Sequence, residues 1–279
     1  MVNSEDADAF FTVDGESLVP APMAQGPWGN TVSGHILGGL AGWAVEQACP
    51  DPGLQPARLT VDMLRPTLMQ PLRVRTEVRR EGRRIKVVDT DITQNDQIVC
   101  RATSVFLRRG EHPEDQIWSP AAAVPPVPTE PPTIPQHMPF ELWAYGIDTL
   151  HGSLGGTRQE WQQAHSRKYA WVREVRPLIA GHPLTPFTRV ALAADVTSAL
   201  THWSTGGLRY INADFTLSLS RLPDGDFVGL ASDGHNGAEG VASGSATLFD
   251  QRGPIGHCIA IALAQPADAF RPPNHIGLS

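Results

Sequence analysis

One carboxylate in this sequence has surroundings that suit acid–base chemistry. Asp195 follows the apolar, small-residue run VALAA at positions 190–194, within a segment (186–203) that is typical of a buried helix. Burial disfavours the charged form of a carboxyl group, and a carboxylate perturbed in this way is a candidate general base. The alternative is a structural carboxylate that is bonded to Thr197, Ser198 or a strand backbone group, and the sequence leaves both interpretations open.

A second candidate site lies at Ser33-Gly34-His35, where another helix is predicted to begin. The first N–H groups of a helix have no partner within it and lie at the positive end of its dipole. Such groups near Gly34 and His35 can stabilise an oxyanion without a charged side chain. Gly34 also allows a ligand to approach the backbone closely. The alternative is a purely structural helix start, in which a preceding polar side chain caps the helix.

Other site chemistries lack their motifs. The sequence contains no Gly-x-Ser-x-Gly elbow, no Cys-x-x-Cys, no Gly-x-Gly-x-x-Gly fingerprint and no phosphate loop. Its ten histidines are never closer than fourteen positions, so no local pair has the spacing of metal ligands. A basic run over residues 73–86 is better explained as a solvated strand face than as a phosphate site. We therefore expect neither a metal nor a cofactor.

Both halves of the chain show the same order of predicted elements. A helix at 34–48 precedes strands at 57–64, 72–80, 85–92 and 98–107, and a helix at 186–203 precedes strands at 208–219, 226–232, 240–249 and 255–263. Arg65 and Arg221 are 156 positions apart, and Cys100 and Cys258 are 158 apart, each pair at matching points of the pattern. A period near half the chain predicts two copies of one domain.

A proline-rich stretch separates the two halves. Eight prolines fall between Ser119 and Pro139, a density that blocks both helix and strand ladder. We therefore predict an N-terminal domain at 1–117, a linker at 118–139 and a C-terminal domain at 140–279.

The helix predicted at 34–48 is apolar on nearly every face and contains Gly34, Gly38, Gly39 and Gly42. A helix that is apolar all round is buried all round, and its glycines let a sheet approach closely. Apolar and charged residues alternate along 72–79, which indicates antiparallel strands with one solvated face. The sequence thus predicts an α+β fold of two fused hot-dog domains, each a long central helix wrapped by a curved antiparallel sheet.

Composition restricts the partners and the compartment. The 279 residues are 41% hydrophobic with a formal net charge of −7, which allows a real core and argues against nucleic acid or an anionic membrane. We find neither a secretory signal pattern nor an apolar run of the ~20 residues that span a bilayer. Cys49, Cys100 and Cys258 lie far apart in apolar surroundings, which favours buried free thiols in a reducing cytoplasm.

Several stretches resemble the two-hot-dog acyl-CoA thioesterases of the type II bacterial group, especially their actinobacterial thioesterase-like relatives. The first-half stretches are Gly26-Pro27-Trp28, SGHILGG at 33–39, ARLTVDMLRP at 57–66 and VRTEVRREGRR at 74–84. The second-half stretches are Ala194-Asp195, YINADFTL at 210–217 and ATLFD at 246–250. The resemblance spans about residues 10–110 and 140–265.

The resemblance implies a catalytic trio around Asp195. In the resembling enzymes an Asp at this place works with a Thr or Ser and a Gln to orient the water that attacks the thioester carbonyl. Ser232 is the hydroxyl nearest to the Thr/Ser position, whereas the Gln position falls near Ala260, where no Gln is present. The water is then oriented by other groups, for which Ser232, His235 and His257 are the candidates, or the site binds acyl groups without hydrolysing them.

The resemblance further implies the substrate and the assembly. Asp195 and Ser232 are expected to activate water, while backbone N–H groups near Gly34 and His35 hold the oxyanion of acyl-CoA or another acyl thioester. We expect an apolar acyl channel, a homodimer or higher homo-oligomer, and a role in fatty acid metabolism. The alternative is a non-catalytic acyl-thioester or lipid-binding protein. A dehydratase ranks below both, because no acidic residue stands beside Ser33-Gly34-His35.

Overall fold

The computed structural model describes residues 9–118, 124–129, 139–146, 161–162, 164 and 166–271. Its helices are η2 (Pro22–Ala24), α1 (Gly34–Gln47), α2 (Pro186–Ala194) and α3 (Val196–His202). The strands of the first half are β1 (Phe11–Asp14), β2 (Ser17–Pro20), β3 (Leu54–Met63), β4 (Arg73–Glu81), β5 (Ile85–Gln94) and β6 (Gln97–Arg108). Those of the second half are β7 (Phe140–Tyr145), β8 (Tyr169–Glu174), β9 (Trp203–Ser204), β10 (Gly207–Leu208), β11 (Tyr210–Leu219), β12 (Phe227–Ala238), β13 (Val241–Asp250) and β14 (Gly253–Ala264).

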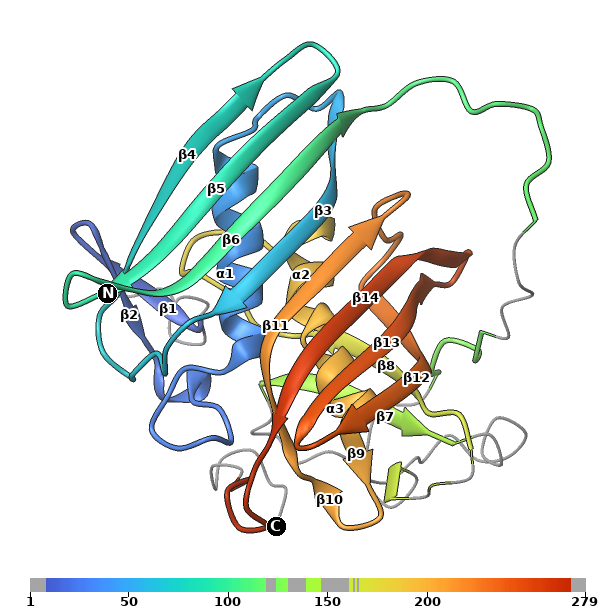
Figure 1. The fold of residues 1–279 in the computed structure, drawn as a ribbon. Coiled ribbons are helices and arrows are strands. Elements are labelled where there is room, and N and C mark those ends of the chain that lie inside the picture. The colour runs from blue at the N-terminus through green and yellow to red at the C-terminus, as the bar shows by residue number, and fades with distance from the viewer. Residues whose placement is uncertain are drawn as a thin grey trace.

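One antiparallel sheet of ten strands runs through both halves, in the order β4-β5-β6-β3-β11-β14-β13-β12-β8-β7 (Figure 1). Strands β3 and β11 pair at its centre, and the order outward from them is the same on both sides for four strands. Thr60 pairs with Thr216 at this junction, with their Oγ1 atoms 3.1 Å apart. These two residues are 156 positions apart, the same spacing as Arg65 and Arg221. Antiparallel pairing of equivalent strands places a local two-fold axis between the halves.

The second half has two further strands that sequence reasoning missed. Strand β8 pairs with β12, and β7 pairs with β8 and forms the edge, so the sheet extends beyond the strand that corresponds to β4. Five of the six residues of β8 are buried, since β8 is covered on both faces. A strand covered on both faces carries no alternation of apolar and polar residues to reveal it. Both added strands bring side chains to the site described below.

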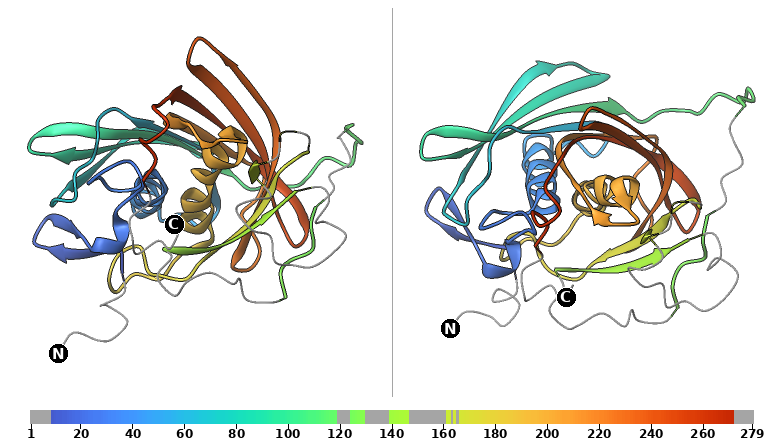
Figure 2. Two further views of the ribbon diagram at one scale, coloured as in Figure 1. Left: turned by 90° about the horizontal axis from the view of Figure 1, so that it is seen from below. Right: turned by 60° about the horizontal axis from the view of Figure 1, so that its bottom comes forward.

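The helices lie side by side on the concave side of the sheet, with α1 against α2 and with α3 in the curl of the second half (Figure 2). The glycines of α1 make room for α2 as well as for the sheet. A Cβ atom on Gly42 would lie 2.6 Å from Cβ of Ala191, and one on Gly38 would lie 2.7 Å from Cζ of Phe215. The apolar face predicted for this helix is buried accordingly. Contact between the two helices thus joins the halves through one core.

The helix of the second half differs from the prediction. We expected one long central helix over 186–203, but α2 ends at Ala194 and α3 begins at Val196, with Asp195 between them. Asp195 keeps right-handed helical backbone angles (φ −62°, ψ −27°), and the Ser198 N–H bonds its carbonyl in a tight i to i+3 turn. A long continuous helix is therefore wrong for this half. The break places Asp195 at a helix junction, where its side chain reaches α1.

The remaining predictions about the chain concern its linker, thiols and membrane contact. Residues 124–129 of the proline-rich stretch form neither helix nor strand, and most of the rest of that stretch lies outside the described residues. Cys49, Cys100 and Cys258 are free and buried. Among the described segments, no helix has the length and apolar character needed to cross a membrane.

Candidate active site

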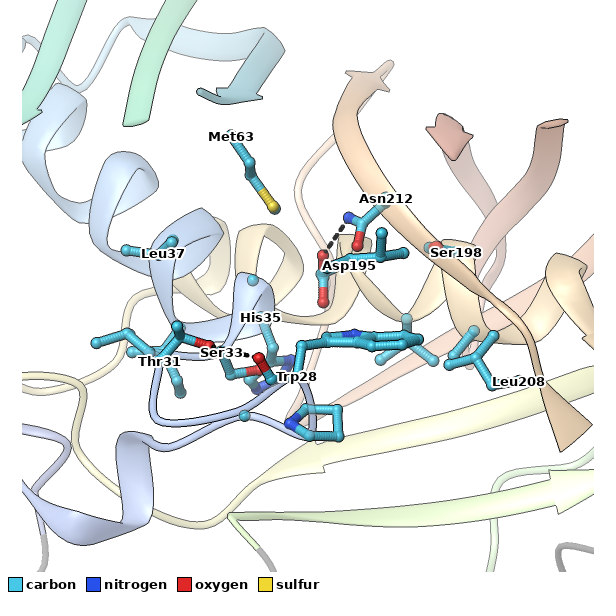
Figure 3. A pocket seen from close by; sticks show the side chains of 18 of the residues that line it. Trp28, Thr31, Ser33, His35, Leu37, Met63, Asp195, Ser198, Leu208 and Asn212 are labelled. Carbon is cyan, nitrogen blue, oxygen red and sulfur yellow. Dashed lines mark hydrogen bonds between the residues drawn. The ribbon is translucent and has the colours of Figure 1, made fainter. Parts of the chain in front are cut away.

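A pocket of about 430 Å³ opens between the start of α1, the α2–α3 junction and the start of β11 (Figure 3). Its walls are largely apolar and aromatic. Trp28, Phe270, Trp203 and Trp161 form a chain of edge-to-face ring contacts along one wall, with centroids 5.4–5.7 Å apart. A mostly apolar cavity with few polar groups is the usual form of a small-molecule site. Among the described residues the charged or titratable groups that line it are Arg65, His35, Asp195 and Tyr210.

The Asp195 carboxylate lies in the wall of this pocket and is held by two donors. Asn212 Nδ2 donates to Oδ1 at 2.7 Å (Figure 3). The backbone N–H of His35 donates to the same carboxylate. Burial raises the pKa of Asp195 above its usual value, while these two hydrogen bonds and the charge of His35 act in the opposite direction. The result is a carboxylate whose basicity is increased and whose orientation is fixed.

Asn212 belongs to this site, although sequence reasoning did not select it. Strict alternation along β11 would place Asn212 on the same face as Asp214. A bulge between these two residues shifts the register of β11 against β14, so that Asn212 lines the pocket. The available signal was a polar side chain at the start of the first strand after the Asp195 helix. The bulge itself has no such signal.

The start of α1 meets Asp195 directly. A Cβ atom on Gly34 would lie 2.8 Å from Asp195 Oδ1 and 2.9 Å from Cε of Met63, so close approach does require glycine here. In this structure the group that approaches is the carboxylate. The sequence predicts that the His35 N–H holds an oxyanion. In the structure this N–H donates to the Asp195 carboxylate, so the two predicted sites meet at one backbone group.

The His35 imidazole is buried and points away from Asp195 toward a second carboxylate. Its Nε2 atom lies 3.0 Å from Oε1 of Glu174, with the two side chains 4% and 1% exposed. The ring stacks on Phe140, with centroids 4.3 Å apart. Burial lowers the pKa of His35, but the charge and hydrogen bond of Glu174, the charge of Asp195 and a hydrogen bond to the Leu192 backbone outweigh it and raise that pKa overall. Glu174 was not among the residues singled out from the sequence.

The structure places the other predicted residues away from the pocket wall. Ser232 lies at a bulge of β12, where its Oγ accepts the Lys168 N–H at 3.1 Å, and it is not a lining residue. His235 Nδ1 lies 2.8 Å from His202 Nδ1, and His257 is exposed on β14. Ala260 is fully buried. The hydroxyl group that does line the pocket near Asp195 is that of Ser198, one helical turn later (Figure 3).

The described part of the chain contains no group of three or more His, Cys, Asp or Glu side chains placed to hold a metal ion. The polar groups that line the pocket include the Asp195 carboxylate, the Asn212 amide, the Ser198 hydroxyl group and the N-terminus of α1.

Comparison with known proteins identifies the family. The family model described as "Acyl-CoA thioesterase N-terminal domain" matches residues 24–107, and that described as "Acyl-CoA thioesterase C-terminal domain" matches residues 120–263. The chain therefore belongs to the acyl-CoA thioesterase family, and the resemblance seen in the sequence is confirmed. No protein with a curated description matches the sequence.

Solved structures with the same fold cover nearly the whole chain. A tesB protein from Mycobacterium avium subsp. paratuberculosis is 19% identical, with a TM-score of 0.64 over 91% of this chain and 94% of its own. An acyl-CoA thioesterase II, TesB2, from Mycobacterium marinum is 20% identical, with a TM-score of 0.59 over 84% and 91%. A protein from Alicyclobacillus acidocaldarius described as having a hot dog fold is 16% identical, with a TM-score of 0.66 over 95% and 99%. At these identities the likeness shows the hot-dog fold alone.

Proposed function

We propose that this member of the acyl-CoA thioesterase family hydrolyses an acyl thioester, acyl-CoA or a related carrier ester, by general-base attack of water. The observation that carries the proposal is the Asp195 carboxylate, which lies in the wall of an apolar pocket and is oriented by Asn212 and the His35 N–H. A general base works best when its pKa lies near the working pH, and burial moves Asp195 in that direction.

The proposed reaction needs no covalent enzyme intermediate. Asp195 accepts a proton from a water molecule as the water oxygen bonds to the thioester carbonyl carbon. The carbonyl becomes a tetrahedral oxyanion, which collapses and breaks the C–S bond. The proton held by Asp195 then passes to the leaving thiolate, which restores the carboxylate.

The oxyanion is assigned to the N-terminus of α1. In the first turn the Ser33 N–H bonds the Ala24 carbonyl and the His35 N–H bonds Asp195, which leaves the N–H groups of Gly34 and Ile36, of which that of Gly34 is the proposed donor. The positive end of the helix dipole supports negative charge at this place. The sequence-based roles of Gly34 and His35 on the substrate, and of Ser232 on the water, stay proposals.

The proposal also includes the arrangement of the molecule. We take the halves as two fused hot-dog units, at 1–117 and 140–279 with a linker between them, and the matched strand order supports this. A homo-oligomer is supported by the exposed apolar side chains of Ile259, Ile261 and Leu263 along β14. Buried free thiols support a reducing, cytoplasmic compartment.

A second candidate function is binding of an acyl thioester or lipid without hydrolysis. It is favoured by Ala260, which offers no polar group where the resembling enzymes have Gln, and by the position of Ser232 outside the pocket wall. Release of free thiol from short-, medium- and long-chain acyl-CoAs by the purified protein distinguishes the two. Turnover supports the hydrolase, whereas a raised melting temperature without turnover supports the binding protein. A protein that neither cleaves nor binds these thioesters contradicts both.

A further inference from the structure

We propose that Glu174 is a positioning residue of this site, which acts through His35 to keep the Asp195 carboxylate ionised. The inference rests on the proposed function of Asp195 and adds a residue that does not line the pocket. Glu174 ends β8, the strand next to the edge strand β7 of the second half, while His35 lies in the first turn of α1 of the first half. The coupling therefore runs across both halves of the chain.

His35 is the link because it contacts both carboxylates through different atoms. Its Nε2 atom lies 3.0 Å from Glu174 Oε1, and its backbone N–H donates to Asp195. The ring is held against Phe140 of β7 and beside the Leu192 carbonyl of α2. The imidazole thus has one fixed orientation between the two acidic groups.

A purely structural role explains this pair poorly. Removing two charges from water costs several kcal/mol per ion, so a buried ion pair contributes little net stability compared with apolar side chains of the same size. Glu174 and His35 are nonetheless almost completely buried, directly behind an acid that lines the pocket. A buried histidine whose pKa is shifted by a specific charged partner, next to a cleft, is characteristic of functional sites.

Most of the remaining charged groups around His35 bond other partners. On α2, Arg189 bonds the backbone carbonyl of Glu174 and the Asp226 carboxylate. The other charged or titratable side chains on the neighbouring elements include Glu46 of α1 with Thr185 and Thr188, Arg173 of β8 with Glu141 of β7, and His202 of α3 with His235. Arg176, two residues after Glu174, also has a partner, and the phenols on these strands are Tyr145 of β7 and Tyr169 of β8.

His35 is therefore the cation that acts on Asp195, and Glu174 sets its charge. The charge of Glu174 raises the pKa of His35, and protonated His35 in turn lowers the pKa of Asp195. Without the Glu174 charge, His35 loses its proton at lower pH. Asp195 then loses the positive charge of His35, which otherwise lowers its pKa. The pKa of Asp195 rises further, because less remains to counter the effect of burial.

The test is Glu174→Gln, which keeps the side-chain shape and removes the charge. NMR of the isotopically labelled His35 imidazole and Asp195 carboxyl group should show the His35 midpoint moved to lower pH and the Asp195 midpoint to higher pH. The acid limb of the kcat/KM profile should move to higher pH, with about a tenfold loss on the acid side and near wild-type activity at high pH. Glu174→Asp keeps the charge and should restore both midpoints.

Glu46→Gln is the matched control, because Glu46 is a partly buried carboxylate whose pKa is raised by burial, but it bonds Thr185 and Thr188 at the other end of α1. It should leave both NMR midpoints and the pH profile unchanged. Unchanged midpoints in Glu174→Gln, or equal changes in Glu46→Gln, would overturn the inference even if Asp195 proves essential. Because the NMR titration needs no turnover, a lack of thioesterase activity contradicts the proposed function and leaves this measurement to decide the coupling. If Glu174→Gln does not fold, Glu174→Leu takes its place, because it also removes the charge: a His35 midpoint at lower pH with an Asp195 midpoint at higher pH supports the coupling, and wild-type midpoints contradict it.

Discussion

A Cβ atom on Gly34 would lie 2.8 Å from Oδ1 of Asp195. The contact joins the start of α1 to the α2–α3 junction, so segments from opposite halves of the chain define one site. The backbone of Gly34 is right-handed helical, a conformation that any residue can adopt. The obstacle to a side chain at position 34 is therefore the lack of space. The orientation of the proposed base therefore depends on the absence of a side chain at position 34.

Gly34→Ala should lower kcat by about a hundredfold, because the added methyl group displaces the Asp195 carboxylate and small displacements of a reacting group are costly. The measurement is steady-state hydrolysis of an acyl-CoA together with the melting temperature. Gly110→Ala is the control, since a Cβ atom there meets nothing within 4 Å. A Gly34→Ala enzyme with kcat within about twofold of the wild type would contradict the assigned geometry.

Asn212→Ala should shift the acid limb of the pH–rate profile to higher pH. The bond from Asn212 Nδ2 lowers the pKa of Asp195, so its loss raises that pKa and the base is protonated at a higher pH. The full kcat/KM profile is the measurement. Asn236→Ala, on the exposed part of β12, is the control and should leave the profile unchanged. If Asn212→Ala lowers activity equally at all pH values, Asn212 acts on something other than the charge of Asp195.

Arg65→Ala should raise KM for acyl-CoA with little change in kcat. Arg65 is exposed and, within the described residues, is the basic side chain other than His35 that lines the pocket, so it is positioned for the phosphates of the carrier. An acyl-pantetheine substrate without the nucleotide serves as the control, and its KM should not respond to the substitution. An equal rise in KM for both substrates would show that Arg65 contacts the acyl or pantetheine part.

Ser198→Ala should lower kcat by about tenfold, because Ser198 lines the pocket one turn after Asp195 and offers a hydroxyl group there for orienting water. Ser232→Ala belongs in the same assay, since a catalytic role for Ser232 stays a prediction from the sequence. A loss of kcat in Ser232→Ala with none in Ser198→Ala would show that Ser232, and not Ser198, orients the attacking water.

Much of the fold was predictable, because most elements carry a periodic pattern. The helix predicted at 34–48 and the four strands of each repeat match α1, β3–β6 and β11–β14 closely. Strands β7 and β8 were missed, since residues buried on both faces show no period of two. The break at Asp195 has no signal either, because the surrounding residues favour helix and only contacts with α1 reveal the junction.

The site was predictable where one short segment carries the chemistry. Asp195, Gly34 and His35 follow from local composition and helix position, and the structure brings them together. The positions of Asn212 and Glu174 depend on the bulge of β11 and on the added strand β8, which are tertiary features. A histidine and a glutamate far apart in sequence give no indication that they meet.

Asp195→Asn tests the central claim most directly. The amide keeps the side-chain shape but cannot accept the proton from water, so kcat for acyl-CoA hydrolysis should fall at least about a hundredfold. Binding of acyl-CoA, measured as the rise in melting temperature, should persist, and the variant should be no less stable because it removes a charge that burial disfavours. A folded Asp195→Asn protein that releases thiol at the wild-type rate would contradict the assignment of Asp195 as the general base.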